Sequence, residues 1–197
     1  MTEVWVSDPD GSGAWLLLTT RLKIINLFWP SSDSIALVSR GTDKKRSLSL
    51  VDLQGNFHIL VIARTNLETA WSPDGTAVLV SFSDEEKDTV LNLIQSISGK
   101  ELSLPLEVQA TKCAWHHNGL AITCGISGFD SPAKVAVGSS SIHESVVTLN
   151  LTTHDTSVRF EPLNDLLFGV QGPFMLPGGT NMAFVNPFDQ KPYLLSW

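Results

Sequence analysis

The chain has 197 residues, 43% hydrophobic and 17% charged, which is enough for one domain with a substantial core. Its formal net charge of −7 and pI near 5.1 argue against a nucleic-acid partner, because phosphate binding requires clustered lysine and arginine. The only basic cluster, Lys44-Lys45-Arg46, is interpreted as a solvated turn. No stretch approaches the roughly 20 apolar residues of a membrane-spanning helix, so we expect no direct membrane insertion by this segment.

Residues 1–20 predict a β-hairpin. Two short runs, Thr2 to Ser7 and Ala14 to Thr19, flank a turn made of aspartate, proline, glycine and serine. The same residues lack the charged start and apolar core of a signal peptide. They therefore predict structure rather than a targeting segment.

A tight turn followed by an apolar run recurs along the chain. The full pattern is Trp71-Ser72-Pro73-Asp74-Gly75, in which proline presets φ, aspartate bonds its own backbone and glycine accepts a positive φ. The run from Ala77 to Phe82 predicts a strand buried on both faces. Partial copies of the turn begin at Trp29, Trp115 and Met175.

A second landmark, a glycine after an alternating or apolar run, keeps the same period. Gly11, Gly55 and Gly99 are each 44 residues apart, and another short run follows each glycine. One period therefore holds two hairpins, or four strands. A self-similar unit of about 40 to 45 residues with four strands is typical of a β-propeller blade. The sequence predicts an all-β fold, a β-propeller of four-stranded antiparallel blades.

The repeats divide a single propeller domain, residues 1–197, into successive units. These are a closing hairpin at 1–20, blades at 21–64, 65–106 and 107–162, and a partial blade at 163–197. Glycine, proline and serine predict a long loop inserted at 125–145. Propellers carry about four to eight blades. We therefore expect part of a larger ring, or a four-bladed ring completed by the first hairpin, and self-association through any open blade edge.

The turns also resemble a known family. Residues 71–75 match the WSPDG motif of TolB-type, WD-repeat-like bacterial propellers, and the three other copies match it in part. The resemblance covers nearly the whole chain. Its motif is structural, because it defines a turn and not an activity. It implies a propeller that engages protein partners.

Cys113 and Cys124 lie symmetrically about the third turn, so we expect them to face each other across one hairpin. Opposed residues there lie within the Cα separation of roughly 4.4 to 6.8 Å that a disulfide accepts. The spacing predicts a cross-strand disulfide, with two buried thiols as the alternative. The Lys112-Cys113-Ala114-Trp115 and Cys124 pattern also resembles uncharacterised bacterial extracytoplasmic propellers. This resemblance implies a disulfide and a periplasmic or cell-surface location, with the cytoplasm as the alternative.

Patterns that carry catalysis or bind metals are missing from the sequence. His116 and His117 replace the Ser-Pro of the motif, and adjacent residues of an extended chain point to opposite sides, which suits chelation poorly. The acidic residues at 84–88 lack the spacing of a calcium loop. There is neither a Gly-x-Ser-x-Gly elbow nor a glycine-rich phosphate loop. We predict no catalytic residue, no metal and no cofactor.

The tryptophans of the first three turns have two interpretations. They fill the wedge between adjacent blades, or they lie near the propeller's mouth and stack on a peptide or sugar. The polar residues beside them are expected to cap turns and to line a central channel. The candidate ligand contacts at the channel mouth are Trp29, Asp33, Trp71, Asp74, Trp115, His116, His117 and Asn118.

Two classes of function fit this sequence. The first is a non-catalytic binding or scaffolding propeller that mediates protein–protein interaction or holds a peptide or glycan. The second is the regulatory propeller of a larger hydrolase, since similar repeats gate access in prolyl-oligopeptidase-like peptidases. The missing catalytic constellation favours the binding module and a chain that is not an enzyme. We expect its specificity to lie in the 125–145 insertion.

Overall fold

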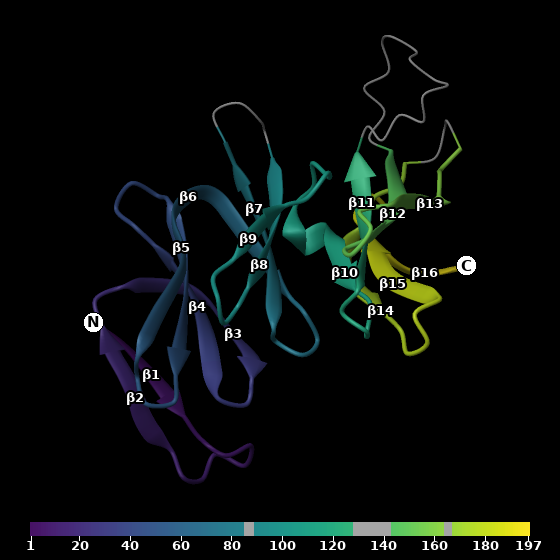
Figure 1. The fold of residues 1–197 in the computed structure, drawn as a ribbon. Coiled ribbons are helices and arrows are strands. Elements are labelled where there is room, and N and C mark those ends of the chain that lie inside the picture. Colours follow the sequence, from purple (N-terminus) through teal and green to yellow (C-terminus); the bar gives the residue numbers. More distant parts are fainter. Residues whose placement is uncertain (85–88, 128–142, 164–166) are drawn as a thin grey trace.

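The computed structural model describes residues 1–84, 89–127, 143–163 and 167–197. Over this part of the chain, sixteen strands pair in antiparallel sheets, and the one helical element is the 3₁₀ turn η1 (Ala110–Lys112). The prediction of an all-β, antiparallel fold is confirmed. The sheets follow one another in chain order from the N-terminus to the C-terminus (Figure 1).

The strands form a hairpin and four further sheets, which we number in chain order. The hairpin holds β1 (Thr2–Val6) and β2 (Trp15–Thr20). Sheet 1 holds β3 (Lys23–Ser31), β4 (Ser34–Arg40), β5 (Arg46–Asp52) and the first half of β6 (Phe57–Trp71). Sheet 2 holds the second half of β6 with β7 (Ala77–Ser83), β8 (Val90–Gln95) and β9 (Glu101–Ser103).

The C-terminal part of the chain adds two more sheets. Sheet 3 holds β10 (Cys113–Trp115), β11 (Ala121–Ser127), β12 (Glu144–Asn150) and β13 (Thr156–Phe160). Sheet 4 holds β14 (Gln171–Met175), β15 (Asn181–Asn186) and β16 (Lys191–Ser196). Sheets 3 and 4 each keep strictly sequential strand order.

Strand β6 runs without a break across the predicted blade boundary between residues 64 and 65. Its first half pairs with β5 as far as Arg64, and its second half pairs with β7 from Thr65 onward. Ala63 and Asn66 have φ angles of 49° and 54°, which few residues other than glycine adopt. These two residues turn the chain from one sheet to the next without interrupting the strand.

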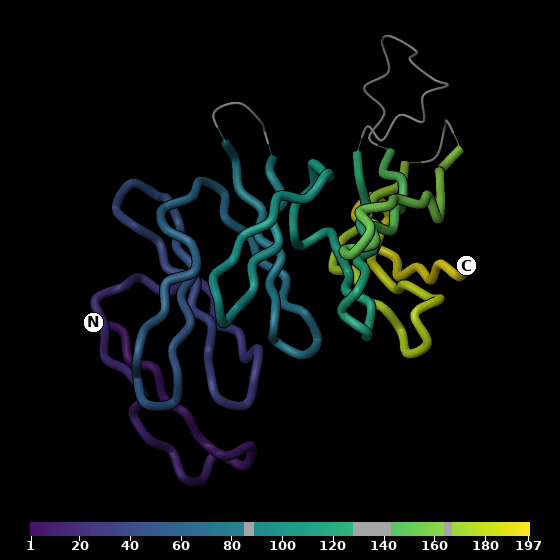
Figure 2. The backbone as a smooth tube through the Cα atoms, viewed as in Figure 1, coloured from purple at the N-terminus to yellow at the C-terminus, as the bar shows by residue number. Residues whose placement is uncertain are grey.

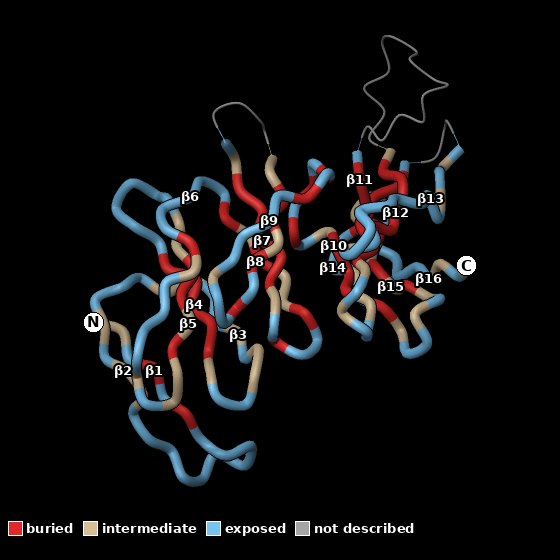
Figure 3. Tube along the Cα trace, in the orientation of Figure 1, coloured by how far each residue is buried: buried red, intermediate tan, exposed pale blue. Residues whose placement is uncertain are grey.

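The core is a series of layers between successive sheets (Figure 3). In β7, Val78 and Val80 pack toward sheet 1, whereas Leu79 packs toward sheet 3. This strand is therefore buried on both faces, as its apolar run predicted. Because each layer is shared by two sheets, a substitution in a layer weakens both.

The sheets present two opposite rims (Figure 2). One, here called the turn rim, holds the tight turns β1–β2, β3–β4, β5–β6, β6–β7, β8–β9, β10–β11 and β14–β15. At the opposite rim, β7 and β11 end and β8 and β12 begin. The strand ends that bound the predicted insertion, at Ser127 and Glu144, thus lie at the rim away from the repeated turns.

Two sequence interpretations require correction. Lys44 and Lys45 lie in an exposed turn, but Arg46 begins β5 and its Nη1 donates to the carbonyl oxygen of Leu67 at 3.0 Å, so the basic cluster is not wholly a solvated turn. The insertion predicted at 125–145 is shorter, because β11 continues to Ser127 and β12 begins at Glu144. Its residues 128–142 lie outside the described part of the chain, as do 85–88 of the acidic run.

Candidate functional site

A groove of about 430 Å³ opens on the turn rim between sheets 1 and 2. Residues at the four turns β3–β4, β5–β6, β6–β7 and β8–β9 line it. Three of these turns contribute a carboxylate, namely Asp33, Asp52 and Asp74. We treat this groove as the candidate functional site because it is open, lies between two well-packed sheets and contains two of the predicted contact residues.

The three carboxylates are held by hydrogen bonds within their own turns. Asp33 accepts from the Ser31 hydroxyl at 2.6 Å, and Asp74 accepts from the Ser72 hydroxyl at 2.7 Å. Asp52 accepts from the side-chain amide of Asn56 and from the Asn56 backbone N–H, both at 2.8 Å. Such bonds stabilise the turn and fix the direction of the carboxylate.

These hydrogen bonds also favour the charged form of two carboxyl groups. The Asn56 amide holds the pKa of Asp52 below its ordinary value, and the Ser72 hydroxyl does the same for the pKa of Asp74. Asp74 is exposed and Asp52 is half-buried, and both remain anionic at neutral pH. The groove therefore carries a fixed negative charge.

Apolar side chains form the other part of the groove lining. Ile97 is 89% exposed at the β8–β9 turn, and Phe57 is 43% exposed at the start of β6. Leu50 of β5 is half-buried in the lining, and the exposed imidazole of His58 adds a polar edge. No lysine or arginine lines this groove within the described residues.

Gly75 sets the spacing between the two sheets at the groove. Its φ is +70°, and a Cβ at this position would lie 2.2 Å from the carbonyl oxygen of Pro30 on β3. The β6–β7 turn thus presses directly on the first strand of sheet 1. Only glycine allows this close approach together with the left-handed backbone conformation.

The third turn, between β10 and β11, does not reach this groove. Trp115 is 8% exposed, and its Nε1 donates to the carbonyl oxygen of Ala70 at 3.0 Å. The Asn118 side-chain oxygen accepts from the Leu120 backbone N–H at 3.0 Å, whereas His117 is exposed. These residues hold the turn and join sheet 3 to sheet 2.

His116 is partly buried beneath the same turn. Its Nε2 lies 2.9 Å from the Thr123 hydroxyl oxygen. Burial is the main cause that lowers the pKa of His116, and the positive charges of Arg159 and His117 lower it further. The ring is therefore neutral at neutral pH and packs as part of the sheet.

The tryptophans of the first three turns differ in their surroundings. Trp115 is buried, and Trp71 packs against the layer between sheets 1 and 2. Trp29, on β3, is 51% exposed. Their equal positions in the repeat therefore do not give them equal roles.

Of the candidate contacts, the structure places Asp33 and Asp74 together in the groove. Trp29, Trp71, Trp115, His116, His117 and Asn118 do not line it. The sequence interpretation missed Asp52, Phe57 and Ile97, which line the groove beside them. A signal for Asp52 and Ile97 was present, since both flank the glycines that recur every 44 residues and mark turns on one rim.

Cys113 and Cys124 are directly opposed on β10 and β11, and a disulfide joins them. Both residues are buried in the layer between sheets 2 and 3. The disulfide therefore ties the hairpin of the third turn to the middle of the core, away from the groove.

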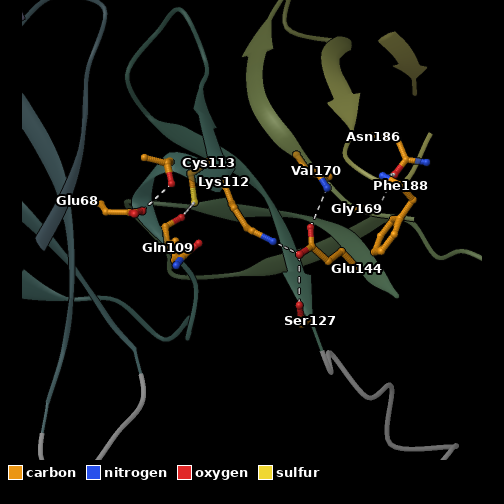
Figure 4. Close-up of polar contacts among 11 residues, drawn as sticks. Glu68, Gln109, Lys112, Cys113, Ser127, Glu144, Gly169, Val170, Asn186 and Phe188 are labelled. Carbon is orange, nitrogen blue, oxygen red and sulfur yellow. Dashed lines mark hydrogen bonds and ion pairs between the residues drawn. The ribbon is translucent and has the colours of Figure 1, made fainter. Parts of the chain in front are cut away.

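An ion pair between a partly exposed lysine and a buried glutamate lies near the opposite rim (Figure 4). Glu144 is 2% exposed and pairs through its Oε1 with Lys112 of η1. The same oxygen accepts from the Ser127 hydroxyl at 3.3 Å, and Oε2 accepts from the Val170 backbone N–H at 2.8 Å. Glu144 thus connects the end of β11, the start of β12 and the segment leading into sheet 4.

The described ranges contain neither a cluster of metal ligands nor a membrane-spanning helix. No three His, Cys, Asp or Glu side chains there gather in a way that could hold a metal ion. Nor does this part of the chain contain a helix with the length and apolar character needed to cross a membrane.

Comparison with known proteins identifies the fold. No protein-family profile matches the sequence, and no curated protein matches it. TolB from Acinetobacter baumannii has a similar structure, with a TM-score of 0.62 at 15% identity over 98% of this chain and 48% of that one. An oligogalacturonate lyase in complex with manganese gives a TM-score of 0.68 at 14% identity over 96% of this chain and 52% of that one.

A prolyl endopeptidase structure is also similar, with a TM-score of 0.64 at 16% identity over 88% of this chain and 29% of that one. The chain spans about half or less of the length of these three proteins. At such identities the likeness concerns the fold alone. The predicted resemblance to TolB-type propellers is confirmed at that level, and the chain has a TolB-like β-propeller fold.

Proposed function

We propose that this chain is a non-catalytic binding module that holds a peptide segment of a partner protein on its turn rim. The observation that carries the proposal is the open groove between sheets 1 and 2, with its exposed Phe57 and Ile97. Protein interfaces use exposed apolar anchors of this kind within a polar surround. Two sheets with buried layers on both sides support the groove.

The turns around the groove are ordered before any ligand arrives. Their carboxylates already accept hydrogen bonds from neighbouring backbone and side-chain groups. A preorganised site loses less conformational entropy when it binds. This property favours recognition of an extended peptide without rearrangement of the sheets.

Selection from a random peptide library on the immobilised chain tests the proposal. Enriched peptides are measured by fluorescence polarisation against the wild type and against the double variant Phe57→Ala/Ile97→Ala. We expect about tenfold weaker binding, or about 1.4 kcal/mol, for the double variant. Leu120→Ala is the matched control, because Leu120 is 56% exposed on another turn of the same rim.

The proposal fails if no enriched peptide binds the wild type above background. It also fails if the double variant binds every enriched peptide as tightly as the wild type does. Circular dichroism of both variants separates loss of binding from loss of fold.

A second candidate function is the regulatory propeller of a larger hydrolase. The structural likeness to a prolyl endopeptidase supports it, although that likeness is to 29% of the endopeptidase chain. This function requires a hydrolase domain joined to these residues. Mass spectrometry of the intact protein from its native source would reveal such a domain.

We further propose an extracytoplasmic location, periplasmic or at the cell surface. The disulfide between Cys113 and Cys124 supports this location, because disulfides persist in oxidising compartments. Thiol labelling of the native protein before and after reduction tests it. Labelling of both cysteines without reductant would favour the cytoplasm instead.

A further inference from the structure

We infer that the groove between sheets 1 and 2 takes an extended peptide bearing lysine or arginine. This inference rests on the binding function proposed above and names the chemistry of its partner. The ion pair of Glu144, by contrast, has its polar partners within the fold, namely Lys112, the Ser127 hydroxyl and the Val170 backbone N–H.

Charge complementarity is the first argument. Asp33, Asp52 and Asp74 come from three different turns, so their negative charges are spread along the groove. No lysine or arginine in the lining neutralises them. Lys100 follows the β8–β9 turn but does not line the groove. At more than one position of the groove, a cationic side chain can therefore contact a carboxylate that has no cationic partner.

The apolar lining is the second argument. Lysine and arginine lay their aliphatic stems on apolar surface while the charged end reaches a polar partner. Ile97 and Phe57 offer such a surface beside the carboxylates. The Phe57 ring can also attract a cation over its face. An acidic peptide would instead place like charges together.

Further aspartates surround the groove on the turn rim. Aspartates recur in the turns of the turn rim, at Asp8, Asp10, Asp33, Asp52 and Asp74. The opposite rim carries both signs of charge, because Asp43 precedes Lys44 and Lys45 in the β4–β5 connection and Asp84 follows β7. The aspartates of the turn rim therefore add to the attraction of the groove for a cationic segment.

Three fluorescein-labelled probe peptides of equal length test the inference. They repeat Ala-Lys-Leu, Ala-Gln-Leu or Ala-Glu-Leu three times and are measured by fluorescence polarisation at low salt. We expect the lysine peptide to bind at least about tenfold more tightly than the glutamate peptide. Its affinity should fall as salt is added, since exposed charges are screened.

A triple variant, Asp33→Asn/Asp52→Asn/Asp74→Asn, locates the interaction. Asparagine keeps one acceptor oxygen for the turn hydrogen bonds while it removes the charge. We expect this variant to lose most of its affinity for the lysine peptide. The matched control is Asp8→Asn/Asp10→Asn/Asp155→Asn, which removes three exposed charges from turns outside the groove.

The inference is overturned if the glutamate or glutamine peptide binds as tightly as the lysine peptide. It is equally overturned if the control variant weakens binding as much as the groove variant, since the attraction would then be general. Neutral or acidic library peptides that lose affinity in Phe57→Ala/Ile97→Ala would overturn this inference but leave the proposed binding function intact. If no peptide bound to the groove, both this inference and the proposed binding function would be contradicted.

Discussion

Trp115 Nε1 donates a hydrogen bond of 3.0 Å to the carbonyl oxygen of Ala70, on the second half of β6. The indole ring belongs to the layer between sheets 2 and 3, and Ala70 packs against the same layer. One side chain thus supplies both apolar contact and a directional bond between two sheets. Buried indoles are most stable when their N–H has such a partner.

This contact predicts graded effects of substitution at Trp115. Trp115→Phe keeps an aromatic ring but leaves the Ala70 carbonyl without its donor, and we expect a loss of about 1 to 3 kcal/mol in the free energy of unfolding. Trp115→Ala should cost about 3 to 5 kcal/mol. Urea denaturation followed by circular dichroism measures both. Trp29→Ala is the control, because Trp29 is 51% exposed, and an equal loss there would contradict the interpretation.

The ion pair of Lys112 and Glu144 predicts a non-additive result. Lys112→Met leaves the 2% exposed carboxylate of Glu144 without its cation, and we expect a loss of about 3 to 5 kcal/mol. The double variant Lys112→Met/Glu144→Gln removes the stranded charge and should recover part of that loss. Equilibrium unfolding of the two single variants and the double variant gives the coupling energy. Additive effects would mean that the pair does not interact.

His116 predicts that acid weakens the fold. Burial lowers the pKa of His116 in the folded protein below its unfolded value of 6.5, so the unfolded chain binds the proton more readily. The stability that neutral His116 contributes is present above pH 6.5 and is lost as the pH falls from there through the folded pKa. His116→Gln should flatten the dependence of the free energy of unfolding on pH in this range. His117→Gln removes only the last and smallest of the three causes that lower the pKa of His116, so it should change the dependence less than His116→Gln does.

The disulfide predicts a response to reductant. Cys113 and Cys124 are 11 residues apart, and closing a loop of this size stabilises a fold by about 2 to 3 kcal/mol in the chain-entropy description. Adding reductant should lower the thermal midpoint of the wild type. The variant Cys113→Ser/Cys124→Ser should show a lower midpoint that reductant does not change. If reductant left the wild type unchanged although both thiols became reactive, the stabilising role would be ruled out.

The repeated turns could be predicted from sequence because their chemistry is local. The residues between Trp71 and Gly75 fix their own backbone by a preset φ, a capping carboxylate and a positive φ. The opposition of Cys113 and Cys124 also followed from counting across one turn. Neither prediction needed knowledge of how the sheets pack.

The groove and the ion pair could not be predicted in this way. Ile97 and Asp33 are brought to one groove only by the packing of sheet 2 on sheet 1. Glu144 contacts Lys112 and Val170, which are respectively 32 and 26 residues away in the sequence, because sheets 3 and 4 pack together. In both cases tertiary packing creates the arrangement, and no spacing within a repeat encodes it.

Gly75 and Gly119 form a matched pair that isolates the contact between sheets 1 and 2. Their φ angles are +70° and +68°, so alanine at either position incurs a similar left-handed backbone strain, on the order of 1 to 2 kcal/mol. A Cβ at Gly119 has nothing within 4 Å, whereas one at Gly75 would meet the Pro30 carbonyl oxygen at 2.2 Å. Gly75→Ala should therefore destabilise the protein clearly more than Gly119→Ala in urea denaturation.

The same pair links stability to binding. If Gly75→Ala remains folded, the β6–β7 turn must move away from Pro30, and Asp74 moves with it. We then expect weaker binding of the lysine probe peptide to Gly75→Ala and unchanged binding to Gly119→Ala, measured by fluorescence polarisation below the thermal midpoint of each variant. Equal binding by both folded variants would mean that the position of the Asp74 turn is not important for recognition, so that Asp33 and Asp52 alone would have to hold the cation.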